Sequence, residues 1–153
     1  MSARRPTTLD EQRMPVRVVL AAAWTSFMFL YAYVDILNFF TPGVVEDILD
    51  GRVFEFDLSQ TFSAAALTLM AVPILMVVLS ITLPARTSRL ANLAVAALYV
   101  PVTVFNAVGE SWLLFYGLAI VLELVLLALI LRYAWTWPQA TAQSPLSRSA
   151  IPA

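Results

Sequence analysis

Four long apolar segments occupy most of this 153-residue chain, and few charged residues fall inside them. A bilayer core about 30 Å thick is crossed by roughly 20 helical residues, and each segment reaches or approaches that length. The sequence therefore predicts an all-α protein, a bundle of four transmembrane helices. The predicted spans are residues 18–40, 61–83, 91–109 and 113–135.

Composition argues against several classes of function. The chain is 61% hydrophobic and 12% charged, whereas soluble domains carry about 25% charged residues, so a soluble fold would lack a polar surface. The net charge of −1 argues against a nucleic-acid partner. The apolar spans make the lipid bilayer the expected partner, and a membrane-protein partner or a homo-oligomer stays open. The chain has no Cys and no His, which removes disulfides, thiolate nucleophiles and the commonest general base. We expect no cofactor, no metal site and no enzymatic activity.

The distribution of arginine predicts the orientation of the chain. All nine cationic residues are Arg, and eight of them lie before the first span, between the second and third, or at the end of the fourth and beyond it. Only Arg52 lies on the other side. Because cytoplasmic segments are enriched in Arg, we expect both termini in the cytoplasm and a multi-pass protein of the bacterial inner membrane.

Polar segments flank and divide the helical body. Residues 1–15 and 138–153 are predicted to be disordered cytoplasmic segments around one transmembrane domain, residues 16–137. Residues 84–90 are predicted to form a short loop. Short connections make consecutive helices antiparallel neighbours, so the predicted topology is up-down-up-down.

The connection after the first span has its own pattern. Thr41-Pro42 is typical of a helix N-cap and first helical residue, and Gly51 is placed to end the short amphipathic helix that follows. Residues 54–58 then alternate between apolar and acidic side chains, which predicts an extended return. This segment is interpreted as lying on the outer membrane surface; the alternative is a lid over an outward-facing pocket.

Two acidic residues lie inside the predicted spans, Asp35 near the outer end of the first and Glu123 near the middle of the fourth. An acid at such depth is costly, so it normally faces the bundle and has a partner. We therefore predict that Asp35 points inward and forms hydrogen bonds across helices, with Asn38, Gln60 or Asn106 as partners.

Glu123 is expected to be interior and uncharged, since no Arg lies at its depth. Its expected neighbours are Thr68, Tyr99 and Thr103.

Pro73 interrupts the second span. Because proline has no N–H, the backbone carbonyl group one turn earlier loses its hydrogen-bond donor within the helix.

A stripe runs along one face of the first span at spacings of four and three residues. Helix packing with an interhelical hydrogen bond explains such a stripe as well as a ligand pocket does, and both readings stay open. The stripe comprises Trp24, Met28, Tyr31, Asp35 and Asn38. The candidate ligand-binding residues are Tyr31, Asp35, Asn38, Gln60, Asn106 and Glu123.

Three hypotheses of function follow. The first is the binding or passage of a small cation, proton or polar solute at an outward-facing pocket around Asp35, with Glu123 as a deeper protonatable group. The second is a structural or accessory subunit of a larger membrane complex. The third is a membrane enzyme acting on a lipid or isoprenoid, although no second catalytic group can be named beside either acid.

Several short segments also carry a resemblance. They are Trp24 with residues 31–37 and 42–43, then residues 60–62, 73–80, 89–92 and 133–137. In these segments the chain resembles a bacterial family of small, uncharacterised four-helix membrane proteins, a domain of unknown function. More distantly its architecture is similar to that of DoxX-type proteins. The resemblance implies the fold and the topology, and no reaction.

Overall fold

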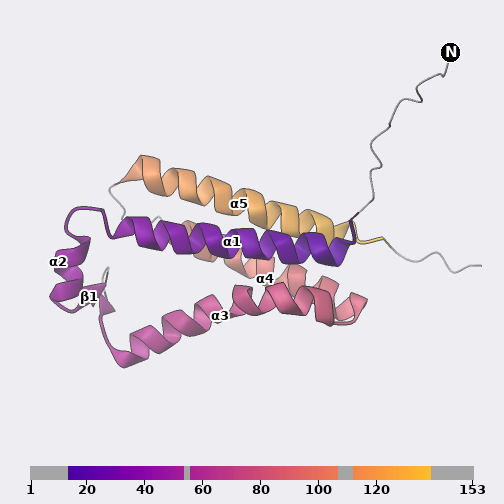
Figure 1. Ribbon diagram of the computed structural model, residues 1–153, viewed down its shortest axis with the longest axis horizontal. Coiled ribbons are helices and arrows are strands. Elements are labelled where there is room, and N and C mark those ends of the chain that lie inside the picture. The colour runs from indigo at the N-terminus through magenta and orange to yellow at the C-terminus, as the bar shows by residue number, and fades with distance from the viewer. Residues whose placement is uncertain (1–13, 54–55, 107–111, 139–153) are drawn as a thin grey trace, which may run out of the picture.

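A computed structural model describes residues 14–53, 56–106 and 112–138. Four long helices lie side by side (Figure 1), and each is long and apolar enough to cross a membrane. They are α1 (Val16–Asn38), α3 (Gln60–Thr82), α4 (Ala85–Phe105) and α5 (Leu113–Trp135). The prediction of an all-α, four-helix transmembrane fold is confirmed.

The four helices are arranged in a ring, and neighbouring helices are antiparallel (Figure 1). α1 packs against α3 and α5, and α4 packs against the same two helices, so α1 and α4 face each other across the centre. There Tyr99 of α4 meets Trp24 and Phe27 of α1 edge to face, with ring centroids 6.4 and 6.0 Å apart. The core also contains Leu20, Tyr31, Met76, Ala96, Leu127, Ile130 and Ala134.

The two ends of the bundle differ in chemistry. The start of α1, the α3–α4 turn and the end of α5 lie together (Figure 1), and we call this the Arg-rich end. Here Arg17 donates to the carbonyl of Ile81 at 2.9 Å and Arg89 donates to that of Trp135 at 3.3 Å. The last carbonyl groups of a helix have no partner within it, so these bonds tie the ends of α3 and α5 to neighbouring helices. Which side of the membrane this end faces stays a prediction.

The other end, which we call the loop end, carries the connection from α1 to α3. It contains α2 (Val44–Leu49) and a short antiparallel hairpin of β1 (Arg52–Val53) and β2 (Phe56–Asp57). Gly51 follows α2 with φ of 78°, in the left-handed region that glycine adopts freely. The predicted short helix, and its end at this glycine, are confirmed.

Two predicted boundaries are wrong. α2 does not begin at Thr41-Pro42, because Gly43 is its N-cap and turns the chain with φ of 91°. Residues 84–90 are not a loop, because α4 begins directly after Pro84. The missing N–H of proline does no harm at the start of a helix. Of the polar residues that indicate a loop, Ser88 is fully buried, while Arg86 and Thr87 lie on the exposed side of the first turns of α4.

The other helix boundaries agree closely with those predicted from the sequence. The observed starts of α1, α3 and α5 lie within two residues of the predicted ones. α4 ends at Phe105, and the predicted continuation to residue 109 lies outside the described residues. The flanking segments predicted to be disordered also lie largely outside them.

Candidate functional site

A buried polar cluster holds three helices together in the Arg-rich half. The Asn92 side chain of α4 accepts from the indole N–H of Trp24 at 2.7 Å and from the Ser80 hydroxyl at 3.1 Å. Its amide donates to the carbonyl of Ser88 at 2.8 Å, and the Ser88 hydroxyl donates to the Ser80 carbonyl at 3.1 Å. All four side chains are fully buried. Because every group has a partner, this cluster stabilises the helix contacts and offers no vacant position to a ligand.

The sequence does not predict that these four side chains form one cluster. The sequence pattern places Trp24 in the stripe on the first span, but Ser88 lies in the segment predicted to be a loop and Asn92 lies just after it. An amide at the start of an apolar span was the available signal, since buried polar groups in a membrane must find partners.

The loop half holds a second set of polar contacts, and here the candidate residues come together. Tyr31 is buried on α1, and the Asn106 amide of α4 donates to its hydroxyl oxygen. Asn38 lies two turns closer to the loop end on α1, and the Tyr116 hydroxyl of α5 donates to its side-chain oxygen at 2.6 Å. These bonds join α1 to both α4 and α5 around the middle and outer part of the bundle.

Glu123 lies beside Tyr31 in the interior, with only 4% of its surface exposed. The hydroxyl of Thr103, which is fully buried, lies beside its carboxyl group. Glu123 also interacts electrostatically with Tyr31 and Asp35. The bundle thus contains a buried acid, a phenol and a buried hydroxyl in one place.

Asp35 lies on the same helix as Tyr31, one turn closer to the loop end, and it is exposed. No hydrogen bond to its carboxylate is found among the described residues, so the predicted bonds to Asn38, Gln60 and Asn106 are wrong. The reason lies in α3: its first turns, Gln60 included, are almost entirely exposed, and this part of α3 diverges from α1 (Figure 1). Asp35 therefore faces an opening and not a packed neighbour.

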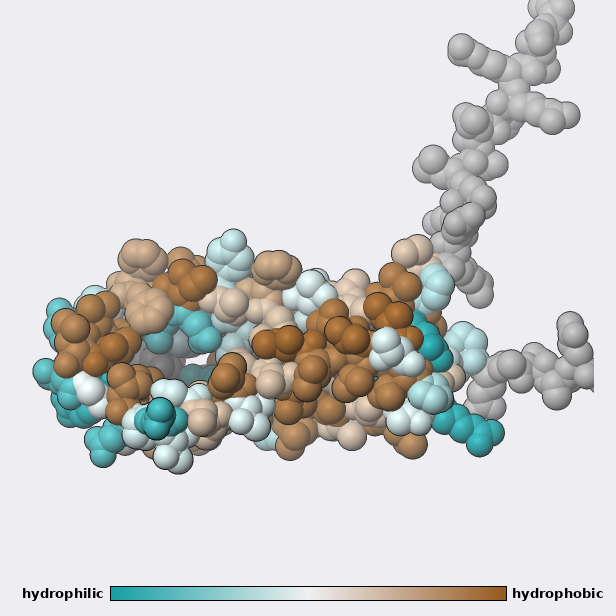
Figure 2. Space-filling view, turned by 60° about the horizontal axis from the view of Figure 1, so that its bottom comes forward, coloured by the Kyte–Doolittle hydropathy of each residue, from teal (hydrophilic) through white to brown (hydrophobic). Residues whose placement is uncertain are grey.

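The polar groups near this opening can be followed in Figure 2. The space-filling view shows a hollow between the loop end and the body of the bundle, with hydrophilic side chains at its wall.

Thr68, a predicted neighbour of Glu123, does not face the interior. It is exposed, and its hydroxyl donates to the Ala64 carbonyl at 2.8 Å within its own helix.

Tyr99, the other predicted neighbour of Glu123, has a different partner. Its hydroxyl donates to the carbonyl of Leu69 on α3. That carbonyl is four residues before Pro73, which has no N–H to donate to it. Tyr99 therefore supplies the bond that the proline removes, and it joins α4 to α3 at the point where α3 begins to leave the bundle.

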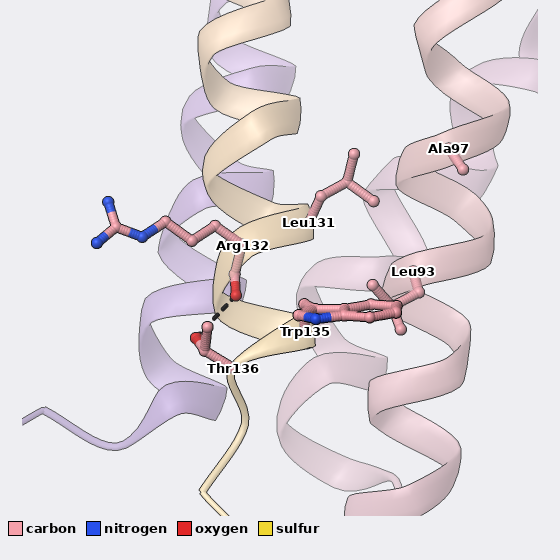
Figure 3. A pocket seen from close by; sticks show the side chains of 6 residues that line it. All are labelled: Leu93, Ala97, Leu131, Arg132, Trp135 and Thr136. Carbon is pink, nitrogen blue, oxygen red and sulfur yellow. Dashed lines mark hydrogen bonds between the residues drawn. The ribbon is translucent and has the colours of Figure 1, made fainter.

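A separate groove lies at the Arg-rich end, between α4 and α5 (Figure 3). It has a volume of about 500 Å³ and an almost wholly apolar lining. In Figure 3 the ring of Trp135 lies across it toward Leu93, while the guanidinium group of Arg132 points away from it. The groove is far from both acids and offers no convergent polar groups.

Comparisons with known proteins give a family and no function. The sequence model of a family described as "Family of unknown function (DUF6326)" matches residues 8–144. No curated protein matches the chain, and no solved structure matches it either. The predicted resemblance to an uncharacterised membrane family is confirmed, and the distant similarity to DoxX-type proteins stays a prediction.

Proposed function

Because this chain belongs to the DUF6326 family of unknown function, we propose its role from the site itself: it binds a small monovalent cation at the acidic pair Asp35 and Glu123. The proposed location is the bacterial inner membrane, with the loop end facing outward. The proposed activity is binding or passage of the cation and not catalysis.

The observation that carries this proposal is the pairing of two acids without a base. Asp35 and Glu123 lie within electrostatic range of each other. The Arg residues of the described helices all lie at the Arg-rich end, and Arg52 in the hairpin pairs with Asp47 at 3.4 Å. Acids at membrane depth normally have a partner, and a cation from outside the chain would supply it.

The neutral groups around the acids suit such a ligand. Tyr31 and Thr103 offer a phenol and a hydroxyl oxygen beside Glu123. The described residues contain no group of three or more acidic, His or Cys side chains placed to hold a metal ion. Divalent calcium takes six to eight oxygen ligands, several of them carboxylates, so the arrangement favours a singly charged cation.

A role as an accessory subunit is the second candidate, and one observation favours it. The first half of α3 is exposed on nearly every side, so a neighbouring membrane protein could pack there. In that case the acids would serve assembly and would show no preference among cations.

The test measures thermal stability of the full-length protein in lipid nanodiscs with sodium, potassium or tetramethylammonium at constant ionic strength. A ligand at 100 times its Kd stabilises the folded state by about 2.7 kcal/mol. We expect such stabilisation for at least one cation, and we expect Asp35→Asn and Glu123→Gln each to abolish it. Asp50→Asn, which changes an exposed acid after α2, is the matched control and should keep it. Equal responses of all four proteins to every cation would reject the proposal.

A further inference from the structure

α3 leaves the bundle halfway along its length. Ala66, Pro73 and Ser80 are spaced by seven residues, so they lie on one face of the helix. Pro73 and Ser80 are fully buried, but Ala66 is exposed. The face that packs inward at the Arg-rich end is therefore uncovered at the loop end, and Figure 1 shows this part of α3 diverging from α1.

The facing side of α1 shows the same change. Arg17 contacts α3 through the Ile81 carbonyl, and Asp35 lies 18 residues later on the chain, which is five helical turns. Asp35 therefore faces α3. Met28, two turns before it on the same face, packs partly buried against the core, while Asp35 is exposed. Along this face α1 is thus covered at Met28 and uncovered at Asp35, and Figure 1 shows α3 diverging from α1 toward the loop end.

We call the resulting space between the loop-end halves of α1 and α3 the α1–α3 gap. Phe62 of α3 stacks on Phe56 of β2 with ring centroids 5.7 Å apart, so the hairpin lies near the loop end of the gap. The gap lies within the membrane-spanning segments, where the surrounding solvent is hydrocarbon. A ligand that enters between these helices must therefore partition into the bilayer.

From this geometry we propose that the cation is amphiphilic. Its charged head group lies at Asp35 and Glu123, and its apolar chain lies in the α1–α3 gap against the uncovered face of α3 at Ala66. This inference rests on the proposed function, to which it adds the class of ligand: a monovalent organic cation with an aliphatic chain, entering sideways from the membrane.

The charge of the ligand follows from the two acids, and its shape follows from the gap. A fully hydrated inorganic ion has no reason to prefer a site open to lipid, because the cost of an ion in hydrocarbon is high. An alkylammonium ion places its chain where lipid would otherwise lie and brings only its head group to the acids. Small side chains on the inner face of the diverging segment, such as Ala66, leave room for that chain.

The test compares three probes by titration into nanodiscs with and without the protein, so that partition into lipid is subtracted. The probes are decyltrimethylammonium, tetramethylammonium and uncharged decyl maltoside. We expect saturable binding of decyltrimethylammonium, at least tenfold tighter than tetramethylammonium, and no saturable binding of the maltoside. Asp35→Asn should abolish binding of the long-chain cation.

Two matched variants examine the gap. Ala66→Phe fills it, whereas Ala64→Phe places the same ring on the opposite, outward face of α3. We expect Ala66→Phe to weaken decyltrimethylammonium binding at least tenfold and to leave tetramethylammonium binding unchanged, and Ala64→Phe to change neither. Ala66→Leu, a smaller addition, should act in the same direction if the phenylalanine variant does not fold.

The possible failures are distinguishable. If wild-type protein binds both cations equally, or if Ala66→Phe affects neither, the amphiphilic ligand is rejected and cation binding stands. If neither cation binds in a way that depends on Asp35, both proposals are rejected.

Discussion

Tyr99 and Pro73 are expected to be energetically coupled through a third group, the carbonyl of Leu69. Tyr99→Phe removes only the hydroxyl that donates to this carbonyl. A polar group left without a partner costs about 1–3 kcal/mol, while measured hydrogen bonds between membrane helices average about 0.6 kcal/mol and reach about 1.7. We therefore expect Tyr99→Phe to lower the free energy of unfolding by about 1–2 kcal/mol.

The coupling appears when proline is also replaced. In the Pro73→Ala background the amide at position 73 can donate to the Leu69 carbonyl within the helix, so the carbonyl no longer depends on Tyr99. There we expect Tyr99→Phe to cost less than about 0.5 kcal/mol. The double-mutant cycle isolates this difference, because any effect of Pro73→Ala that does not involve the Tyr99 hydroxyl is common to both backgrounds and cancels.

Equilibrium unfolding in mixed micelles with increasing dodecyl sulfate, followed by circular dichroism, supplies the four free energies. Tyr33→Phe, which removes the hydroxyl of an exposed tyrosine on α1, is the control and should change nothing. An equal cost of Tyr99→Phe in both backgrounds would show that the hydroxyl does not compensate for the proline.

Three further predictions concern the other contacts. Asn92→Ala should destabilise the protein by about 2 kcal/mol, because it leaves the buried indole N–H of Trp24 without an acceptor. A cycle with Trp24→Phe should give a coupling of about 1 kcal/mol by the same unfolding assay; strict additivity would contradict it. Tyr116→Phe should cost about 1 kcal/mol through its bond to Asn38, and an unchanged midpoint would count against that bond. Reporter fusions at the C-terminus and within residues 47–57 should report opposite sides of the membrane, with the C-terminal one cytoplasmic; the reverse pattern would refute the predicted orientation.

Local sequence properties were enough to predict most of the fold. The spans follow from the length of the apolar segments, and the end of α2 follows from Gly51, because these features depend on nearby residues alone. The interior position of Glu123 also follows from its place in the sequence, because a carboxyl group at mid-membrane is costly in contact with lipid and normally faces the bundle.

The failures concern features set by several helices together. The sequence did not predict that Asn92 joins three helices, because the rotation of α4 decides which polar side chain faces inward. It did not predict that Asp35 is exposed, because that depends on where α3 diverges. The divergence in turn involves Pro73, the carbonyl at Leu69 and a tyrosine from another helix, a combination that no single segment reveals.

The position of Asn92 also has a consequence for biosynthesis. Helices enter the membrane in chain order as the protein is made, so α1 and α3 arrive before α4. Until α4 is inserted, the indole N–H of Trp24 lacks the acceptor that Asn92 provides. During this interval α1 and α3 are in the membrane with an unpaired polar group. We therefore expect a nascent chain that stops after α3 to be a substrate for membrane quality control, and release from it to coincide with the insertion of α4.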